Sequence, residues 1–305
     1  MAFTAKDVQK LREMTGVGMM DCKKALTDTD GDMDAAVTLL REKGLAAAAK
    51  KAGRIASEGI VYANVYENGV GVICEVNSET DFVAKNSEFM KFTQDVADVI
   101  ASRNPADLDS LMDMPYPNSE LTVADLQRDK VLVIGENIRI RRFARFDTGS
   151  NVSYVHMGGK IGVLVSLKAE GISNKPAIEE LGKDVAMQIA AMNPRFLNRS
   201  EVDSKTLEEE RSILMAQTMQ EGKPPEVAEK IVAGRMNKFY QENCLEDQAY
   251  VKENKQSVKQ HCDAVAKELG GSIGILGFVR FEKGEGLEKR SDNLADEVAK
   301  MVSGK

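Results

Sequence analysis

The sequence has few of the side chains that enzymes commonly use for catalysis. Its 305 residues include no tryptophan, two histidines and four cysteines, and aromatic residues make up only 5%. His156 and His261 are too far apart for the His-Glu-x-x-His zinc motif, and no Cys-x-x-Cys pair occurs. We therefore expect no metal site, no bound cofactor and no covalent catalysis.

Other absent features exclude further classes of protein. No apolar run approaches the roughly 20 residues needed to cross a bilayer, so we expect no membrane association. No apolar signal segment or Arg-rich transit segment follows Met1, and four unbridged cysteines fit a reducing compartment, so we expect a cytoplasmic protein. The net charge of -7 argues against a broad nucleic-acid surface, because duplex binding rests on a basic surface.

What is present is typical of a globular protein with two or three domains, at 43% hydrophobic and 29% charged residues. The first part of the chain is patterned as a small helical module. Thr4 is suited to cap a helix that stops at Gly16, a second short helix covers 19–26, and a third is expected to end at Gly44. Residues 45–53 then form a helical extension or a linker.

The pattern next changes to the period of two that is typical of strands, with Asn68-Gly69 as a hairpin turn. The expected elements are strands at 59–66 and 70–76, a helix from 82 or 87 to 101, a helix at 122–134 and a strand at 138–146. The same order then recurs, with strands at 152–156 and 161–167, a helix at 176–191 and a strand at 272–281. This recurrence predicts a duplicated α+β unit built on antiparallel sheets.

An insertion separates the last helix and the last strand of the second unit. Helical patterns at 206–221 and 226–241 flank Gly222-Lys223-Pro224-Pro225, where glycine ends one helix and proline begins the next. Such a helical arm must cover its apolar stripe against something. The stripe consists of Ile213, Leu214, Met219, Val227 and Ile231. A final helix is expected at 291–302.

Two long motifs now identify a family. Residues 11–26 (LREMTGVGMMDCKKAL) and 75–85 (EVNSETDFVAK) closely resemble the two signatures of elongation factor Ts, and 134–138 (IGENI) and 222–224 (GKP) match as well. The resemblance covers essentially the whole chain. Ser78 stands where some relatives carry cysteine, but the Thr-Asp-Phe-Val core of the second signature is intact.

The resemblance implies an α+β fold with a defined order of modules. These are a three-helix, UBA-like module at 1–55, a core N subdomain at 56–148, a core C subdomain at 149–195 and 242–285, an inserted coiled-coil arm at 196–241 and a C-terminal helical module at 286–305. The arm is suited either to homodimerisation or to contact with distal domains of a partner, and the sequence leaves both open.

The resemblance also implies a function in translation elongation without covalent chemistry. Members of the family are guanine-nucleotide exchange factors that bind elongation factor Tu in its GDP-bound and nucleotide-free forms. In that family the motif formed here by Thr80, Asp81, Phe82 and Val83 intrudes beside the magnesium site of the partner. The residues alone favour a simpler explanation, in which Asp81 caps a helix and Phe82 is packed in the core.

Further partner contacts are expected in the N-terminal module, from Arg12, Met19, Met20 and Lys23. Because so small a domain needs apolar area, we expect at least one of the two methionines to belong to its core. The resemblance implies that His156, before the Gly158-Gly159 turn, helps to hold the Phe-bearing motif against the partner, although a lone histidine is more often structural.

Two other functions compete with exchange. An RNA- or ribosome-associated protein could use the helical module and the basic run of Arg139, Arg141, Arg142 and Arg145 along one strand, but a solvated face or internal ion pairs fit the negative net charge better. An enzyme with Asp81 as general base lacks a companion nucleophile, base or metal cluster.

Overall fold

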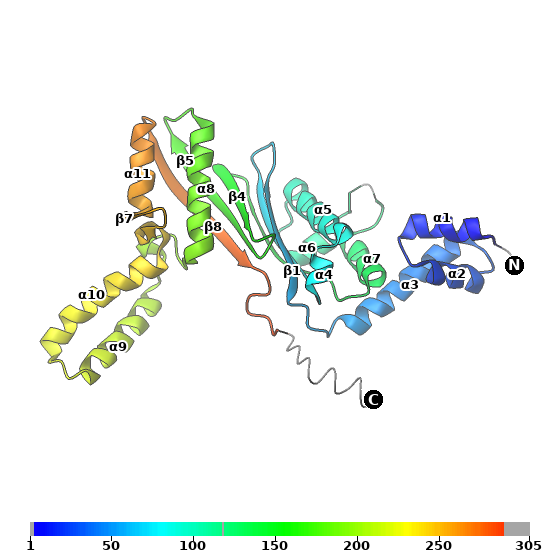
Figure 1. Ribbon diagram of the computed structural model, residues 1–305, viewed down its shortest axis with the longest axis horizontal. Coiled ribbons are helices and arrows are strands. Elements are labelled where there is room, and N and C mark those ends of the chain that lie inside the picture. Colours follow the sequence, from blue (N-terminus) through cyan, green and yellow to red (C-terminus); the bar gives the residue numbers. More distant parts are fainter. Residues whose placement is uncertain (1–2, 118, 290–305) are drawn as a thin grey trace. The chain divides into compact units, whose positions relative to one another are not determined.

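The structure is a computed structural model that describes residues 3–117 and 119–289, and most of its elements are labelled in Figure 1. Its α-helices are α1 (Ala5–Thr15), α2 (Met19–Asp28), α3 (Met33–Lys51), α4 (Asp81–Ala84), α5 (Ser87–Arg103), α6 (Leu108–Met112), α7 (Val123–Ile134), α8 (Lys175–Met192), α9 (Ser204–Gln220), α10 (Pro225–Asn243) and α11 (Val258–Glu268). Short 3-10 helices cover Arg199–Glu201 and Leu245–Asp247. The helix predicted at 291–302 lies outside the described residues.

The strands form small sheets. They are β1 (Glu58–Val65), β2 (Gly71–Ser78), β3 (Arg139–Phe146), β4 (Ser150–His156), β5 (Ile161–Glu170), β6 (Ala249–Tyr250), β7 (Glu253–Ser257) and β8 (Ser272–Glu282). Two sheets have three strands, in the orders β1-β2-β3 and β4-β5-β8, and β6 pairs with β7. In both larger sheets a hairpin is extended on the side of its second strand by a strand from much later in the chain. This shared order confirms the predicted α+β fold with a repeated unit.

The chain divides into two compact units. The first comprises Met1–Tyr62, Cys74–Phe143 and Glu282–Lys305, and the second comprises Ala63–Ile73 and Ala144–Phe281. The division passes through strands of the first sheet. The finer domain boundaries expected from the sequence stay predictions.

The N-terminal helices form as their capping residues indicate. The Thr4 side chain and the Asp7 carboxylate make a reciprocal capping box at the start of α1, and Gly16 ends this helix with a positive φ of 68°. Asp32 caps α3 by accepting hydrogen bonds from the backbone N–H groups of Asp34 and Ala35. The buried core of this module consists of small or aliphatic side chains: Val8, Leu11, Val17, Cys22, Ala25, Leu26, Ala36 and Leu40.

The prediction that Gly44 ends the third helix is wrong, because α3 continues through it to Lys51. Gly44 is buried where α3 packs against α7, and a Cβ there would lie 3.7 Å from Leu132 Cδ2 and 3.8 Å from Asp129 Oδ1. The alanines at 46–49 favour helix strongly enough to continue it. A glycine inside a helix therefore marks a close helix–helix approach here and not a stop.

Two helices follow β2: the short α4, and α5, which begins at Ser87, the second of the two starts predicted for a helix that runs to 101. Asn86 separates them, because its side-chain oxygen accepts hydrogen bonds from Glu88 N at 2.8 Å and Phe89 N at 3.4 Å. It is thus the N-cap of α5. The short α4 is consequently an independent turn of helix directly after β2.

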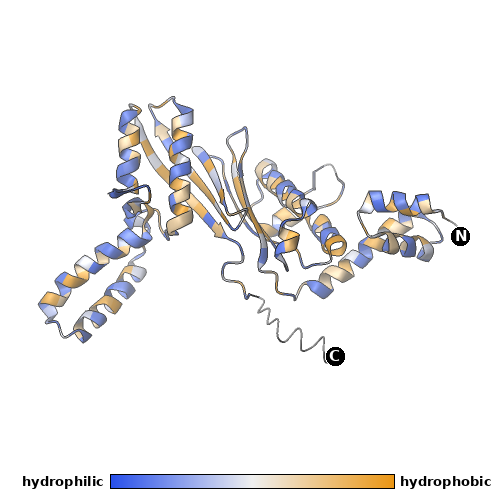
Figure 2. Ribbon diagram, viewed as in Figure 1, coloured by the Kyte–Doolittle hydropathy of each residue, from blue (hydrophilic) through white to orange (hydrophobic). Residues whose placement is uncertain are grey.

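Helix α8 packs on the sheet formed by β4 and β5 (Figure 1). The apolar positions of β5 at Val163, Val165 and Leu167 are buried with Val185 and Ile189 of α8. The β4–β5 hairpin is antiparallel, with His156 opposite Ile161. Figure 2 shows the hydrophobic residues of these strands, which form the core of the second unit.

Helices α9 and α10 pair as the predicted hairpin arm, and both carry alternating hydrophobic and hydrophilic residues (Figure 2). Arg235 ties the two helices by donating to Thr218 Oγ1 at 3.1 Å and by an ion pair with Glu221 at 2.8 Å. Half-buried Leu214 and Ile231 are covered within the arm, whereas the rest of the predicted apolar stripe is exposed: Ile213, Met219 and Val227.

Within residues 3–117 and 119–289, no helix combines the length and the apolar character that crossing a membrane requires.

Two helix glycines provide a test of the packing. We predict that Gly44→Ala raises the free energy of unfolding by about 0.5–1 kcal/mol, because alanine is the better helix former and its Cβ would make only ordinary contacts. Urea unfolding followed by far-UV circular dichroism measures the change.

The matched substitution Gly182→Ala in α8 should have the opposite sign. Its Cβ would lie 2.4 Å from Val152 Cγ2, so we expect a loss of about 1–3 kcal/mol from overpacking. Equal effects of the two alanines would contradict the assigned helix packing.

Candidate functional site

The predicted contact motif lies where β2 ends and α4 begins. Thr80 is the N-cap of α4, since its side-chain oxygen accepts a hydrogen bond from Val83 N at 3.5 Å. Phe82 projects from the first turn with 80% of its surface exposed. The simpler explanation from the sequence is therefore wrong on both points: Thr80, and not Asp81, caps the helix, and Phe82 is not packed in the core.

Asp81 is held as a carboxylate on the same exposed turn. Its Oδ2 accepts a hydrogen bond from Lys85 Nζ at 2.9 Å, one helical turn later. The hydrogen bond from Lys85 lowers the pKa of Asp81. Burial opposes this, but together with the positive charges of Lys85 and Lys283 the bond holds the pKa below its usual value. The turn thus presents an ionised carboxylate beside an uncovered aromatic ring.

The backbone that carries this turn is fastened to the segment after α7. One oxygen of the Glu136 carboxylate, Oε2, accepts hydrogen bonds from Glu79 N and Thr80 N, both at 3.0 Å, and Oε1 accepts from the Thr80 hydroxyl at 2.6 Å. In return, Asn137 N donates to Glu79 Oε1 at 2.7 Å. Sequence reasoning noted 134–138 only as a family match and missed Glu136, whose three bonds join residues more than fifty positions apart.

Strand β2 contains a second carboxylate, Glu75, whose side chain is fully buried. It accepts hydrogen bonds from Arg142 Nε at 2.6 Å, Arg141 Nη1 at 3.1 Å and Gly284 N at 2.8 Å. Burial raises the pKa of Glu75, but the bonds from Gly284, Asn77 and Arg142 more than offset this, and the pKa lies below its usual value. Glu75 thereby joins β2 and β3 to the chain that leaves β8.

Internal ion pairs account for most of the basic run on β3. Arg141 and Arg142 pair with Glu75, and Arg145 pairs with Asp147 at 2.7 Å. Internal pairing, one of the alternatives left open by the sequence, therefore describes these three arginines, and Arg139 is the exposed member of the run. This pairing weakens the case for an RNA-binding strand.

The four candidate contact residues of the N-terminal module are all exposed, one on α1 and three on the first half of α2: Arg12, Met19, Met20 and Lys23. Met19 and Met20 are 42% and 73% exposed, so the expectation that one of them belongs to the core is wrong. Val17 and Cys22 are buried in their place. Met14, at the end of α1, is exposed as well.

His156 ends β4 in the second unit, before a tight turn that contains Gly158 and Gly159, both with positive φ. Its ring is exposed, and its Nδ1 lies 2.9 Å from the Tyr154 hydroxyl. The turn is thus the predicted hairpin tip, and Tyr154 orients the histidine on it. No bond within the second unit gives His156 a catalytic partner among the described residues.

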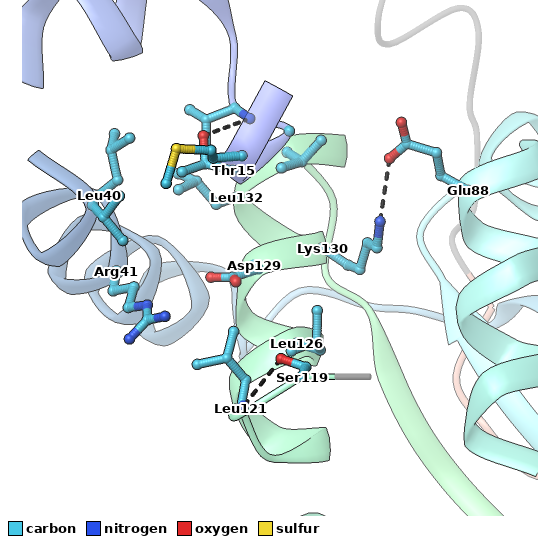
Figure 3. Close-up of a pocket in the computed structure, with 15 residues that line it drawn as sticks. Thr15, Leu40, Arg41, Glu88, Ser119, Leu121, Leu126, Asp129, Lys130 and Leu132 are labelled. Atoms are coloured by element: carbon cyan, nitrogen blue, oxygen red, sulfur yellow. Dashed lines mark hydrogen bonds and ion pairs between the residues drawn. The ribbon is translucent and has the colours of Figure 1, made fainter. Parts of the chain in front are cut away.

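A pocket of about 360 Å³ lies apart from this motif, between the N-terminal helices and α7. Figure 3 shows Arg41 and Asp129 at its wall and the ion pair that joins Lys130 to Glu88 at 3.3 Å. Burial raises the pKa of Asp129, an effect that the nearby charge of Arg41 partly opposes. The remaining lining is largely apolar, and its charged side chains do not form a catalytic set.

The described residues contain no group of three or more His, Cys, Asp or Glu side chains placed to hold a metal ion. What the chain brings together around α4 is an exposed aromatic ring, an ionised carboxylate and a rigid backbone support. This arrangement is suited to contact with another macromolecule.

Comparison with known proteins agrees with the motifs. The family model described as elongation factor TS matches residues 79–285, beginning at the segment that carries the exposed turn. Over nearly their full lengths, relatives named elongation factor Ts are 50% identical in Clostridium perfringens (302 residues; 98% of this chain, 99% of the relative), 48% in Syntrophotalea carbinolica (99% and 100%) and 48% in Magnetococcus marinus (100% of both).

Because the carboxylate of Glu75 is buried and paired, the stability of the protein should depend on pH. We predict that Glu75→Gln lowers the free energy of unfolding at neutral pH by about 3 kcal/mol, the lower end expected for breaking a buried pair, because Arg141 loses the carboxylate while Arg142 keeps its ion pair with Glu285. Since the pKa of Glu75 is lower in the folded chain, its contribution is fully present above about pH 4.5 and disappears as the pH falls through the folded value.

The measurement is chemical unfolding of wild type and variant from pH 7 down to about pH 3, where the two curves should converge. The exposed Glu67→Gln, in the β1–β2 turn, serves as control. A Glu75 effect that stays constant as the pH falls would contradict the assigned ionisation.

Proposed function

Because the chain belongs to the elongation factor Ts family, and so is a translation elongation factor, we propose that it is the guanine-nucleotide exchange factor for elongation factor Tu. It binds the GDP-bound partner, promotes GDP release and stabilises the nucleotide-free form until GTP binds. It performs no covalent step, and it acts in the cytoplasm. The observation that carries the proposal is the exposed Phe82, two residues after a backbone segment that hydrogen bonds tie to Glu136 and Asn137.

Exchange requires the factor to bind the partner more tightly as the nucleotide leaves. A thousandfold acceleration of release corresponds to roughly 4 kcal/mol of differential stabilisation. Burying one phenylalanine that is exposed in the free protein contributes about 1.5–3 kcal/mol. Phe82 can therefore provide a large share, provided that its ring is covered only in the complex.

Asp81 is proposed to act on the magnesium ion that the partner holds with its nucleotide. Mg²⁺ demands nearly ideal octahedral geometry, so a small displacement of its ligands weakens binding. The low pKa of Asp81 keeps a negative charge on the turn at neutral pH. Thr80 and Val83 complete the motif by holding the first turn of α4.

Other surfaces are proposed to hold the partner while this turn acts. Arg12, Met19, Met20 and Lys23 form one, and adaptable methionine side chains suit such a contact. His156, on its hairpin tip, forms another. The arm has an exposed apolar stripe that fits either the partner's distal domains or a second copy of this chain.

The function is tested by the release of fluorescent GDP from purified elongation factor Tu. We predict that the wild-type protein accelerates release and that Phe82→Ala reduces the acceleration by about 10- to 100-fold, the loss expected for an aromatic ring that is exposed in the free protein and covered in the complex. Asp81→Ala should also slow release.

Val251→Ala is the matched control, because it removes an exposed apolar side chain far along the sequence from the motif. Circular dichroism should show that all three variants keep the fold. Unchanged release rates with both Phe82→Ala and Asp81→Ala would remove the motif from the mechanism.

A further inference from the structure

The first turn of α4, which carries Asp81 and Phe82, is called the contact turn below. The side chain that supports it most directly, Glu136, lies outside the turn. The Glu136 carboxylate accepts two backbone N–H groups and one hydroxyl from Glu79 and Thr80. Three hydrogen bonds to one charged group form a stronger and more directional joint than neutral bonds would. We propose that Glu136 is a positioning residue for exchange, a role that rests on the proposed function of the Phe82 turn.

The position of Glu136 is itself set by the local fold. Helix α7 ends at Gly135, whose φ of 84° is the left-handed conformation that favours glycine. The chain therefore turns sharply just before Glu136. Asn137 N then donates to Glu79 Oε1, while Asn137 Nδ2 donates to Arg54 O at 2.9 Å. The two segments hold each other through bonds in both directions, so neither can shift alone.

Glu136 also fixes the hydroxyl that caps α4. Thr80 donates its hydroxyl proton to Glu136 Oε1. The Thr80 hydroxyl oxygen therefore has a lone pair free to accept the hydrogen bond from Val83 N. The cap and the clamp thus share one oxygen atom. The next two residues are Asp81 and Phe82, so an error in the orientation of Thr80 passes directly to the groups that meet the partner.

This role makes a specific kinetic prediction. When Glu136 is lost, the other surfaces should still bind the partner, but the transition state for GDP release should be less stabilised. For Glu136→Ala we expect the maximal rate of accelerated GDP release to fall about tenfold or more, while the concentration of factor that gives half the maximal effect changes by less than about threefold. Glu136→Gln, which keeps one acceptor oxygen, should lie between wild type and alanine.

A double-mutant cycle tests whether Glu136 acts through Thr80. Thr80→Val removes the hydroxyl with little change in volume, and Thr80→Ser keeps it. Thr80→Val removes one of the three bonds that Glu136 accepts and leaves the two from backbone N–H groups. Adding Glu136→Ala to Thr80→Val should therefore cost less than it does in wild type, by the share that the hydroxyl bond contributes. Fully independent effects would overturn an action through the Thr80 hydroxyl, and full activity of Glu136→Ala would overturn the assignment. Thr80→Ser should keep the coupling with Glu136.

Amide hydrogen exchange of the free protein provides a readout that does not depend on the partner. Glu136→Ala should speed exchange at the N–H groups of Glu79 and Thr80, while Glu67→Gln should leave them unchanged. Unaltered protection at both amides would overturn the proposed clamp. A wild-type protein that fails to accelerate GDP release would overturn the proposed exchange function instead, so the two failures are distinguishable.

Discussion

The structure depends most on the reciprocal clamp between the end of β2 and the segment after α7. An exposed phenylalanine on a loose loop would lose much of its binding energy to the ordering of that loop. Here Glu136 accepts three hydrogen bonds from Glu79 and Thr80, and Glu79 accepts one from Asn137. The backbone that leads into the exposed Phe82 is therefore held in place, which suits a contact with a short-lived state of a partner.

A second constraint is the buried carboxylate of Glu75, earlier in the same strand. Glu75 is buried in β2 and binds Arg141 and Arg142 of β3, so the strand that leads to the contact turn is tied to its neighbour by charge as well as by the sheet. The backbone N–H of Gly284 completes this set of bonds. The basic run of β3 is thus used largely for internal structure, in agreement with the negative net charge of the chain.

Local signals in the sequence predicted local structure well. Thr4, Gly16 and Asn68-Gly69 act as caps and a turn because their chemistry depends only on near neighbours. Gly44 misled the prediction, because whether a glycine stops a helix depends on packing against a helix far along the chain. The exposure of Phe82 and the role of Glu136 could not be predicted from local pattern either, since their surroundings come from residues many positions away. The family resemblance identified the motif, whereas its support by Glu136 is seen only in the folded structure.

The most direct test of the central claim is a photo-crosslinking experiment in which Phe82 is replaced by p-benzoylphenylalanine. We expect irradiation in the presence of GDP-bound elongation factor Tu to join this position to the partner's nucleotide-binding region, near its magnesium site. A variant that still accelerates GDP release, but gives no adduct with the partner from position 82, would contradict the account.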